Sequence, residues 1–182
     1  MDNNGYASAP VVQTKYGPIE GFIHTSTSSS GTQQAEIFLA VPYAEPPIGP
    51  LRMERPRSPK PWRVEKDDST DRAKQCKAFG VGSVSLNPSA VELTGEDSLT
   101  VSVFRPRSKV YKRGGEENRA ILVYIHGGGY CSGSSREYGY EQWVENFVLG
   151  EDLIFISVQY RLGPLGFLSA GGESTALPGN LG

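Results

Sequence analysis

Apolar positions in the second half of the chain form short runs that predict β-strands. Residues 99–104 alternate apolar and polar positions, which is typical of a strand with one buried face. Residues Ile121–Ile125 and Leu153–Val158 are almost continuously apolar, which favours strands buried on both faces, as in a parallel sheet.

Between these two apolar runs the spacing changes to that of a helix. Apolar residues recur on one helical face, which predicts a helix over 135–149 that stops at Gly150; these residues are Tyr140, Trp143, Val144, Phe147 and Val148. Strand, glycine-rich loop, helix and strand together predict one βαβ unit with a right-handed crossover.

The first half of the chain is more polar and predicts shorter strands. Val11–Thr14 and Ile19–Thr25 flank a hairpin signal at residues 15–18, and Ala35–Val41 predicts a third strand. The polar composition of Ser26–Gln34 predicts a loop. Prolines recur from 42 to 61, so this segment should run irregularly over the surface. We also expect irregular structure over 67–89 and a disordered segment over 1–10.

These elements place the protein in the α/β class. N-terminal antiparallel strands should lead into the first parallel strands of a central sheet. The chain has 182 residues and a net charge of −2, which does not favour binding to nucleic acid or to an anionic membrane surface. No feature of the sequence indicates an oligomeric state.

Targeting signals and cysteines bear on the compartment. No apolar stretch approaches the roughly 20 residues that cross a bilayer, and the first residues lack a basic region followed by an apolar run. Cys76 and Cys131 are the only cysteines, which excludes a disulfide framework and a cysteine metal site. We therefore expect a cytoplasmic chain with no signal peptide, no metal and no cofactor.

The candidate chemistry lies directly after the Ile121–Ile125 strand, where His126 precedes Gly127, Gly128 and Gly129. A plain tight turn would explain one or two glycines, but three in a row after a buried strand are more specific. A dinucleotide fingerprint does not fit, because Ser132 stands where a third spaced glycine is needed and no acidic residue ends the next strand. The sequence His-Gly-Gly-Gly matches the oxyanion loop of esterases and lipases, whose backbone N–H groups stabilise a tetrahedral intermediate.

A serine nucleophile is harder to find. The nearest match to Gly-x-Ser-x-Gly is residues 172–176, but Ala176 replaces the last glycine and Pro178 prevents a following helix. Ser174 is therefore a poor candidate for the nucleophile. The only histidines, His24 and His126, both precede it, so no general base follows in the required chain order.

Four stretches in order resemble the type-B carboxylesterases, the family that includes the cholinesterases. They are Phe-Leu-Ala-Val-Pro-Tyr-Ala-Glu-Pro-Pro-Ile-Gly-Pro-Leu-Arg at 38–52, Gly-Glu-Asp-Ser-Leu-Thr-Val at 95–101, the loop at 126–133, and Tyr-Arg-Leu-Gly-Pro-Leu-Gly-Phe-Leu at 160–168. The resemblance implies an α/β-hydrolase fold of which residues 11–182 form the N-terminal part, ending before the nucleophile elbow.

The resemblance also implies roles for individual residues. Gly128 and Gly129 would supply two oxyanion-hole N–H groups, while the serine, acid and histidine of the triad would lie outside this chain. Arg52 and Glu96 would form a buried ion pair that braces the N-terminal loop; the alternative is two solvated charges. The complete enzyme would hydrolyse a small-molecule ester through an acyl-enzyme intermediate, and this chain alone should be inactive.

Departures from the family pattern matter as well. The family disulfide that would join the positions of Cys76 and Ser98 cannot form, because Ser98 is not a cysteine. Leu86 precedes Asn87-Pro88 where cholinesterases carry a tryptophan, which disfavours a choline substrate. Cys131 is expected to be a small packing residue, with a thiol facing the site as the alternative.

Two further hypotheses stay open. One is a non-catalytic, adhesion-type protein resembling the neuroligins, against which stand the three intact glycines. The other is that the chain does not fold into a functional unit, because the apolar strands at 121–125 and 153–158 would need neighbouring strands and covering helices.

Overall fold

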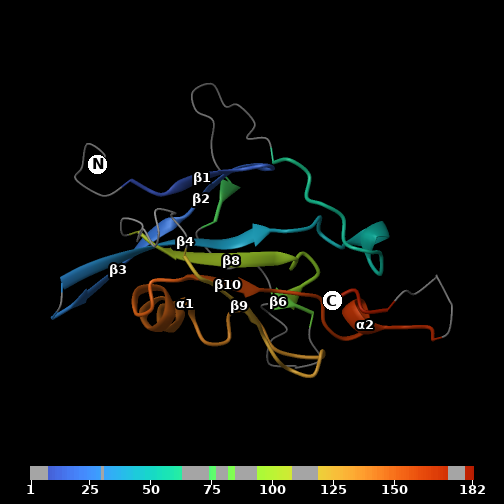
Figure 1. The fold of residues 1–182 in the computed structure, drawn as a ribbon. Coiled ribbons are helices and arrows are strands. Elements are labelled where there is room, and N and C mark those ends of the chain that lie inside the picture. Colours follow the sequence, from blue (N-terminus) through green and yellow to red (C-terminus); the bar gives the residue numbers. More distant parts are fainter. Residues whose placement is uncertain are drawn as a thin grey trace.

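A five-stranded mixed sheet is the centre of the computed structural model, which describes residues 8–29, 31–62, 74–76, 82–84, 94–107, 119–171 and 179–182. The strand order is β3-β4-β8-β10-β9 (Figure 1). The strands are β3 (Phe22–Ser28), β4 (Gly31–Pro42), β8 (Thr100–Pro106), β9 (Ile121–Ile125) and β10 (Ile154–Val158).

Smaller elements surround this sheet. A second sheet contains β1 (Val11–Thr14), β2 (Gly17–Glu20) and β5 (Lys74–Gln75), and a third contains β6 (Gly82–Ser83) and β7 (Thr94–Gly95). The helical segments are η1 (Gly49–Leu51), α1 (Tyr140–Trp143), η3 (Val144–Leu149) and α2 (Gly163–Phe167).

The strand directions confirm the predicted fold class. β3, β4 and β8 pair antiparallel, and β8 pairs antiparallel with β10. β9 and β10 pair in parallel, from Ile154 opposite Ile121 to Val158 opposite Ile125. The chain therefore enters through antiparallel strands and reaches one parallel βαβ unit, whose crossover is formed by α1 and η3.

The main core lies between the central sheet and this crossover. Its buried side chains come from β4, β8, β10 and the crossover helices, and are Ala35, Ile37, Leu39, Phe104, Trp143, Val144, Val148 and Phe155. Phe104 is edge-on to Trp143 with ring centroids 5.8 Å apart, and Trp143 stacks on Phe155 at 5.1 Å. Trp143, Val144 and Val148 lie on one side of the crossover helices, and their side chains cover one face of the sheet.

The β1–β2 hairpin packs on the opposite face, as Figure 1 shows with the hairpin and α1 on either side of the sheet. Ile19 is buried there with Phe38 and Cys76. The chain changes sheet at Gly21, where a Cβ atom would lie 2.1 Å from the carbonyl oxygen of Ile37. Glycine is required at this close approach, and the predicted strand at 19–25 is therefore divided between β2 and β3.

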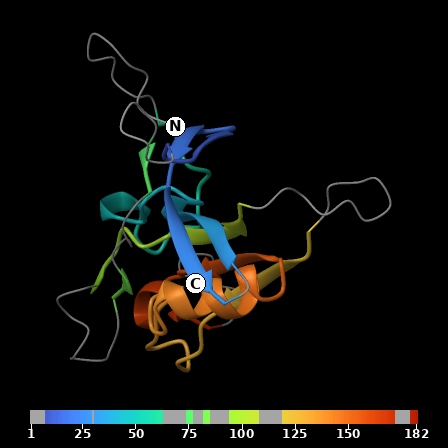
Figure 2. The same cartoon turned by 90° about the vertical axis from the view of Figure 1, so that its left-hand side faces the viewer.

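The β3–β4 hairpin is longer than expected. The predicted loop at 26–34 is wrong, because the strands stay paired as far as Ser28 opposite Gly31. Its polar side chains indicate solvent exposure rather than irregular backbone. Figure 2 shows the hairpin passing α1, and Glu145 of η3 ties it there by contacts with His24 Nε2 at 2.9 Å and Ser26 Oγ at 2.8 Å.

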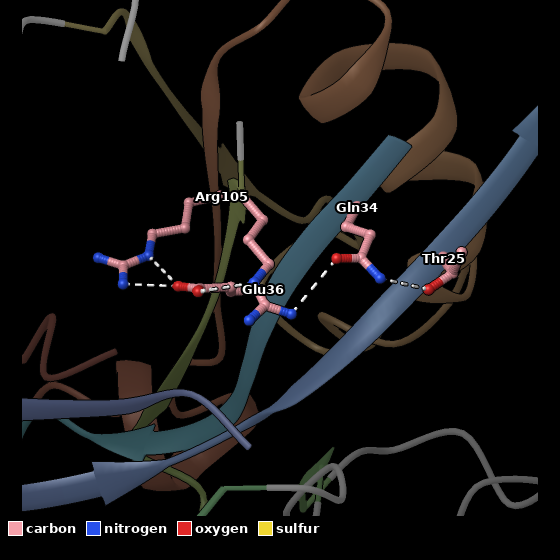
Figure 3. Close-up of polar contacts among 5 residues, drawn as sticks. Thr25, Gln34, Glu36 and Arg105 are labelled. Carbon is pink, nitrogen blue, oxygen red and sulfur yellow. Dashed lines mark hydrogen bonds and ion pairs between the residues drawn. The ribbon is translucent and has the colours of Figure 1, made fainter. Parts of the chain in front are cut away.

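A polar ladder crosses β3, β4 and β8 on the face opposite the main core (Figure 3). Arg105 donates to Glu36 from Nε at 2.7 Å and contacts it from Nη2 at 2.6 Å. Arg107 Nη1 donates to Gln34 Oε1 at 3.3 Å, and Gln34 Nε2 donates to Thr25 Oγ1 at 3.1 Å. These side chains satisfy one another's hydrogen-bonding groups on the part of this face that lies beyond the β1–β2 hairpin.

The predicted helix at 135–149 begins later than expected. Gly139 has φ +69°, so the helix starts at Tyr140, and the turns before it belong to an irregular loop. After one α-helical turn the backbone widens to a π-helix over 144–149, with Gly150 N–H donating to Glu145 O at 3.2 Å. The end at Gly150 agrees with the prediction.

The prediction that residues 121–125 are buried on both faces is wrong. Ile121, Val123 and Ile125 are 61%, 51% and 67% exposed. β9 is the last strand of the sheet in the described structure, so only its β10 side is paired. On the other face Tyr124 packs against the core, while Leu122 is still 39% exposed.

Several predictions fall outside the described residues. These are most of the expected disordered segment at 1–10, most of the irregular segment at 67–89, Leu86-Asn87-Pro88, and Ser174 with its near match at 172–176. Among the described residues, no helix is both long enough and apolar enough to cross a membrane.

Candidate active site

The glycine-rich loop leaves the sheet at the carboxyl end of β9, beside the end of β10. Gly128 has φ +123° and Gly129 has φ +59°, and Tyr130 follows at φ +62°. The carbonyl of Gly128 accepts hydrogen bonds from Cys131 N–H and Ser132 N–H, both at 3.1 Å, and from Ser132 Oγ at 3.0 Å. One carbonyl therefore closes the whole turn.

This turn leaves backbone donors unused. No described residue accepts a hydrogen bond from Gly128 N–H or Gly129 N–H. The packing explains why glycine is needed at Gly128, because a Cβ atom there would lie 2.1 Å from Ser132 O. Consecutive N–H groups without acceptors form an anion-binding concavity.

A hollow of about 650 Å³ opens in front of these donors. Its wall is formed by Ile125 and Val158 at the strand ends, by the glycine loop, and by residues 180 and 182. Tyr130, Tyr160 and Phe167 give it an aromatic side, and none of the described side chains that line it is charged at neutral pH. A ligand-sized hollow at the carboxyl ends of parallel strands is the usual position of an α/β active site.

His126 is a structural part of the loop. Its side chain is buried, its ring stacks on Tyr160 with centroids 4.4 Å apart, and Nδ1 lies 2.9 Å from Gly127 O. Burial lowers the pKa of His126, against the opposing effects of the Gly127 hydrogen bond and of Glu137. A neutral imidazole with its proton on Nδ1 fits this geometry, so His126 orients the first glycine.

Gln159, which the sequence did not single out, fixes the far end of the loop. Its buried Oε1 accepts from Ser135 N–H at 2.8 Å and Ser134 Oγ at 3.3 Å. Its Nε2 donates to Ser83 Oγ at 3.1 Å, and its carbonyl accepts from Tyr43 Oη at 2.9 Å. Burial raises the pKa of Tyr43 to about 12, so this phenol stays protonated and keeps donating.

The pair at Ser83 and Ser98 belongs to the same buried network. The two hydroxyl groups lie 2.9 Å apart, and Ser83 Oγ also donates to Tyr160 O. Ser98 is completely buried, and neither Cys76 nor Cys131 forms a disulfide. Ser98 therefore makes a hydrogen bond at the position where the resemblance implies a disulfide cysteine.

Arg161 anchors the segment that completes the hollow. Its guanidinium is buried and donates from Nε to Leu181 O at 2.7 Å and from Nη1 to Glu54 O at 2.9 Å. Burial lowers the pKa of Arg161, opposed by Tyr43. The bond to Leu181 O, together with the bond from Leu181 N–H to Gly166 O in α2, holds this end of the chain beside α2, and the bond to Glu54 O ties Arg161 to the segment after η1.

Arg52 and Glu96 lie in contact, away from the glycine loop. Arg52 Nε and Nη2 donate to the two carboxylate oxygens of Glu96 at 2.6 and 2.7 Å. The expectation that this pair is buried is wrong, because the two side chains are 49% and 25% exposed. Arg52 directly follows η1 and Glu96 directly follows β7, and solvent screens the pair at this exposure.

Cys131 also differs from expectation. It is exposed rather than a small packing residue. The described residues contain no group of three or more His, Cys, Asp or Glu side chains that could hold a metal ion. None of their serine hydroxyl groups contacts His24 or His126, so the described site contains oxyanion donors without a nucleophile and base.

Comparisons with known proteins give a consistent result. The model of the carboxylesterase family matches residues 8–182. Gut esterase 1 of Caenorhabditis briggsae is 35% identical over 175 residues, which cover 96% of this chain and 27% of that protein. Pyrethroid hydrolase Ces2e of Rattus norvegicus is 33% identical, over 92% of this chain and 28% of that protein.

Solved structures give the same picture. A PNB esterase superposes with a TM-score of 0.71 at 27% identity, over 96% of this chain and 32% of its own. The Geobacillus stearothermophilus carboxylesterase EST55 superposes with a TM-score of 0.67 at 26% identity, over 94% of this chain and 31% of its own. The chain thus spans little more than a quarter of the length of these curated relatives.

The environment of His126 predicts a pH dependence. In the folded chain its pKa should lie below the ordinary value of about 6.5, so folding is favoured by the neutral ring. This contribution to stability is complete above pH of about 6.5 and decreases as the pH falls from there towards the folded pKa. NMR titration of the His126 ring protons in a His24→Gln variant, where it is the only histidine, measures this pKa. A value at or above that of a histidine in the unfolded chain would contradict the buried, neutral assignment.

The three glycines should respond differently to alanine. Gly127→Ala should change the free energy of unfolding by less than about 0.5 kcal/mol, because a Cβ atom there meets nothing within 4 Å. Gly129→Ala should cost about 1–2 kcal/mol for its left-handed backbone alone. Gly128→Ala should cost more than Gly129→Ala, because strain and the clash with Ser132 O combine. Urea denaturation of the three variants gives the order, and equal costs for all three would refute the described turn.

Proposed function

The chain belongs to the carboxylesterase family, and we propose that it supplies the oxyanion-binding side of a carboxylic ester hydrolase site. In this proposal the N–H groups of Gly128 and Gly129 donate to the oxygen of the tetrahedral intermediate. The nucleophile, its base and the acid come from outside the residues described here.

One observation carries the proposal. Two adjacent backbone donors have no acceptor in the described structure, and their residues line a hollow at the carboxyl ends of β9 and β10. Donors held in place by the backbone need no reorganisation when charge develops, and this is why they lower the barrier to acyl transfer. Removal of one such donor costs about 10²–10³ in kcat in enzymes of this kind.

The lining of the hollow supports an uncharged ester as the substrate. Tyr130, Tyr160 and Phe167 offer aromatic surface, and the described side chains that line the hollow are uncharged, which favours an uncharged acyl or alcohol group. Members of the family act on small-molecule esters, and a neutral one fits this chain.

The adhesion-type alternative receives no support from this site. Gly128 and Gly129 keep backbone conformations that a larger residue would not adopt without strain. A protein that only binds a partner has no need of these two donors.

We further propose that the protein resides in a reducing compartment such as the cytoplasm. The support is that a hydrogen bond between Ser83 and Ser98 occupies the position of the disulfide expected from the resemblance.

Activity measurements test the proposal in two steps. Purified residues 1–182 should not hydrolyse p-nitrophenyl esters above a protein-free blank, because oxyanion donors without a nucleophile give no turnover. A chimera in which residues 8–182 replace the matching segment of gut esterase 1 should be active. In this chimera Gly128→Ala should lower kcat by about 10²–10³, because it displaces the donors.

The control is Gly127→Ala, which should leave kcat close to that of the unmodified chimera because it leaves the turn intact. The proposal fails if Gly128→Ala leaves kcat unchanged in a folded chimera. It also fails if the chain alone turns over esters and Ser174→Ala abolishes that turnover.

A further inference from the structure

Residues 55–62 run along the surface from η1 to the turn between β1 and β2 and contain no helix or strand (Figure 1). Prolines at 56, 59 and 61 favour an extended backbone. Two backbone bonds fix this segment on the protein, from Glu45 N–H to Arg57 O and from Trp62 N–H to Tyr16 O, both at 2.9 Å. We call residues 55–62 the proline segment.

Ser58 is an exposed hydroxyl group in the middle of the proline segment. Hydrogen bonds from the side chains of Lys15 and Ser58 lower the pKa of Tyr16, which lies in the β1–β2 turn. Lys15 Nζ also lies over the Tyr16 ring, 4.7 Å from its centroid. Ser58 and Lys15 therefore contact the same phenol, although they are distant in sequence.

The surroundings of Ser58 are positively charged. Among the described residues, the proline segment, its neighbours and the turn carry more cations than carboxylates; the cations are Lys15, Arg55, Arg57 and Lys60, and the carboxylates are Glu45 and Glu54. Lys60 pairs with Glu45 at 3.3 Å, and no described carboxylate pairs with Arg55 or Arg57. A phosphate group placed here would gain charge-assisted hydrogen bonds.

The residue after Ser58 restricts which enzyme could add a phosphate. Ser58-Pro59 is the only serine or threonine followed by proline in the chain. Because proline has no N–H group, a kinase that binds this segment must accept a residue without a backbone donor after the serine. Proline-directed protein kinases are the class that does so.

We propose that Ser58 is a phosphorylation site for a proline-directed protein kinase, and that Lys15 helps to hold the phosphate. The γ-phosphoryl group of ATP is transferred to Ser58 Oγ, where a new O–P bond forms. The bond between the γ-phosphorus and its bridging oxygen breaks, ADP leaves with that oxygen, and the hydroxyl proton passes to a base of the kinase. The phosphoserine carries a charge of about −1.5 to −2 at pH 7, which offsets the positive excess at this surface.

The chain contains a matched comparison for Ser58. The sequence Arg-Pro-Arg-Ser occurs at 55–58 and again at 105–108, but Pro59 follows the first and Lys109 follows the second. A kinase that requires only the preceding arginines would modify both serines. A proline-directed kinase should modify Ser58 and not Ser108.

Phosphorylation in vitro tests the site. Residues 1–182 are incubated with a cyclin-dependent kinase, Mg²⁺ and ATP, and the phosphate is located by mass spectrometry. We expect incorporation at Ser58 to exceed that at Ser108 at least about tenfold. Ser58→Ala should abolish incorporation, and Ser108→Ala should leave it unchanged.

Phosphorus NMR tests the role of Lys15. A nearby cation stabilises the dianionic phosphate and lowers its second pKa, which is ordinarily about 6. The second pKa should therefore be lower in the folded chain than in the same phosphorylated chain unfolded in urea, where Arg55 and Arg57 stay close but Lys15 does not. Lys15→Gln should remove most of this difference. Lys60→Gln is the matched control, since Lys60 is 82% exposed and pairs with Glu45.

Several results would overturn the proposal. They are no incorporation, equal incorporation at Ser58 and Ser108, and incorporation that persists in Ser58→Ala. The same second pKa in the folded and unfolded chain, or equal effects of Lys15→Gln and Lys60→Gln, would also overturn it. None of these measurements depends on ester hydrolysis, so the inference and the proposed function can fail separately.

Discussion

The backbone conformation at Gly128 is the constraint on which the candidate site depends. Gly128 has a φ of +123°, and in this conformation its carbonyl oxygen accepts hydrogen bonds from Cys131 N–H, Ser132 N–H and Ser132 Oγ. These three bonds close the loop. No described residue accepts a hydrogen bond from the N–H groups of Gly128 and Gly129. A side chain at Gly128 would both strain this conformation and collide with Ser132. The two N–H groups can therefore keep this arrangement only if residue 128 is glycine.

Buried polar groups hold this turn from both sides. His126 secures its start through Gly127 O, and Gln159 secures its end through Ser135 N–H. Gln159 lies at the end of β10, so the parallel ladder between β9 and β10 positions the loop and its anchor together. β9 ends at Ile125, which lies in the wall of the hollow beside the glycine loop.

The sequence predicts the fold and the candidate loop well, and the long-range anchors poorly. Local apolar patterns found β4, β8, β9 and β10, and the run of glycines marked the turn. Continuous apolarity at 121–125 did not reveal that β9 is an edge strand, because a strand's pattern reports what it can bury and not which neighbours are present. Gln159 and Arg161 escaped notice, since their importance comes from partners such as Ser83 and Leu181 that are distant in sequence. The same holds for Arg52 and Glu96, whose contact the resemblance implied and whose exposure only the structure could give.

Amide hydrogen exchange within the loop, followed by NMR, tests the central claim most directly. Gly128 and Gly129 N–H should exchange rapidly, because no described residue accepts a hydrogen bond from them, whereas Cys131 and Ser132 N–H should be protected by their bonds to Gly128 O. This pattern would show two donors held ready by a closed turn. Protection of Gly128 and Gly129, or equally fast exchange at all four amides, would contradict the account.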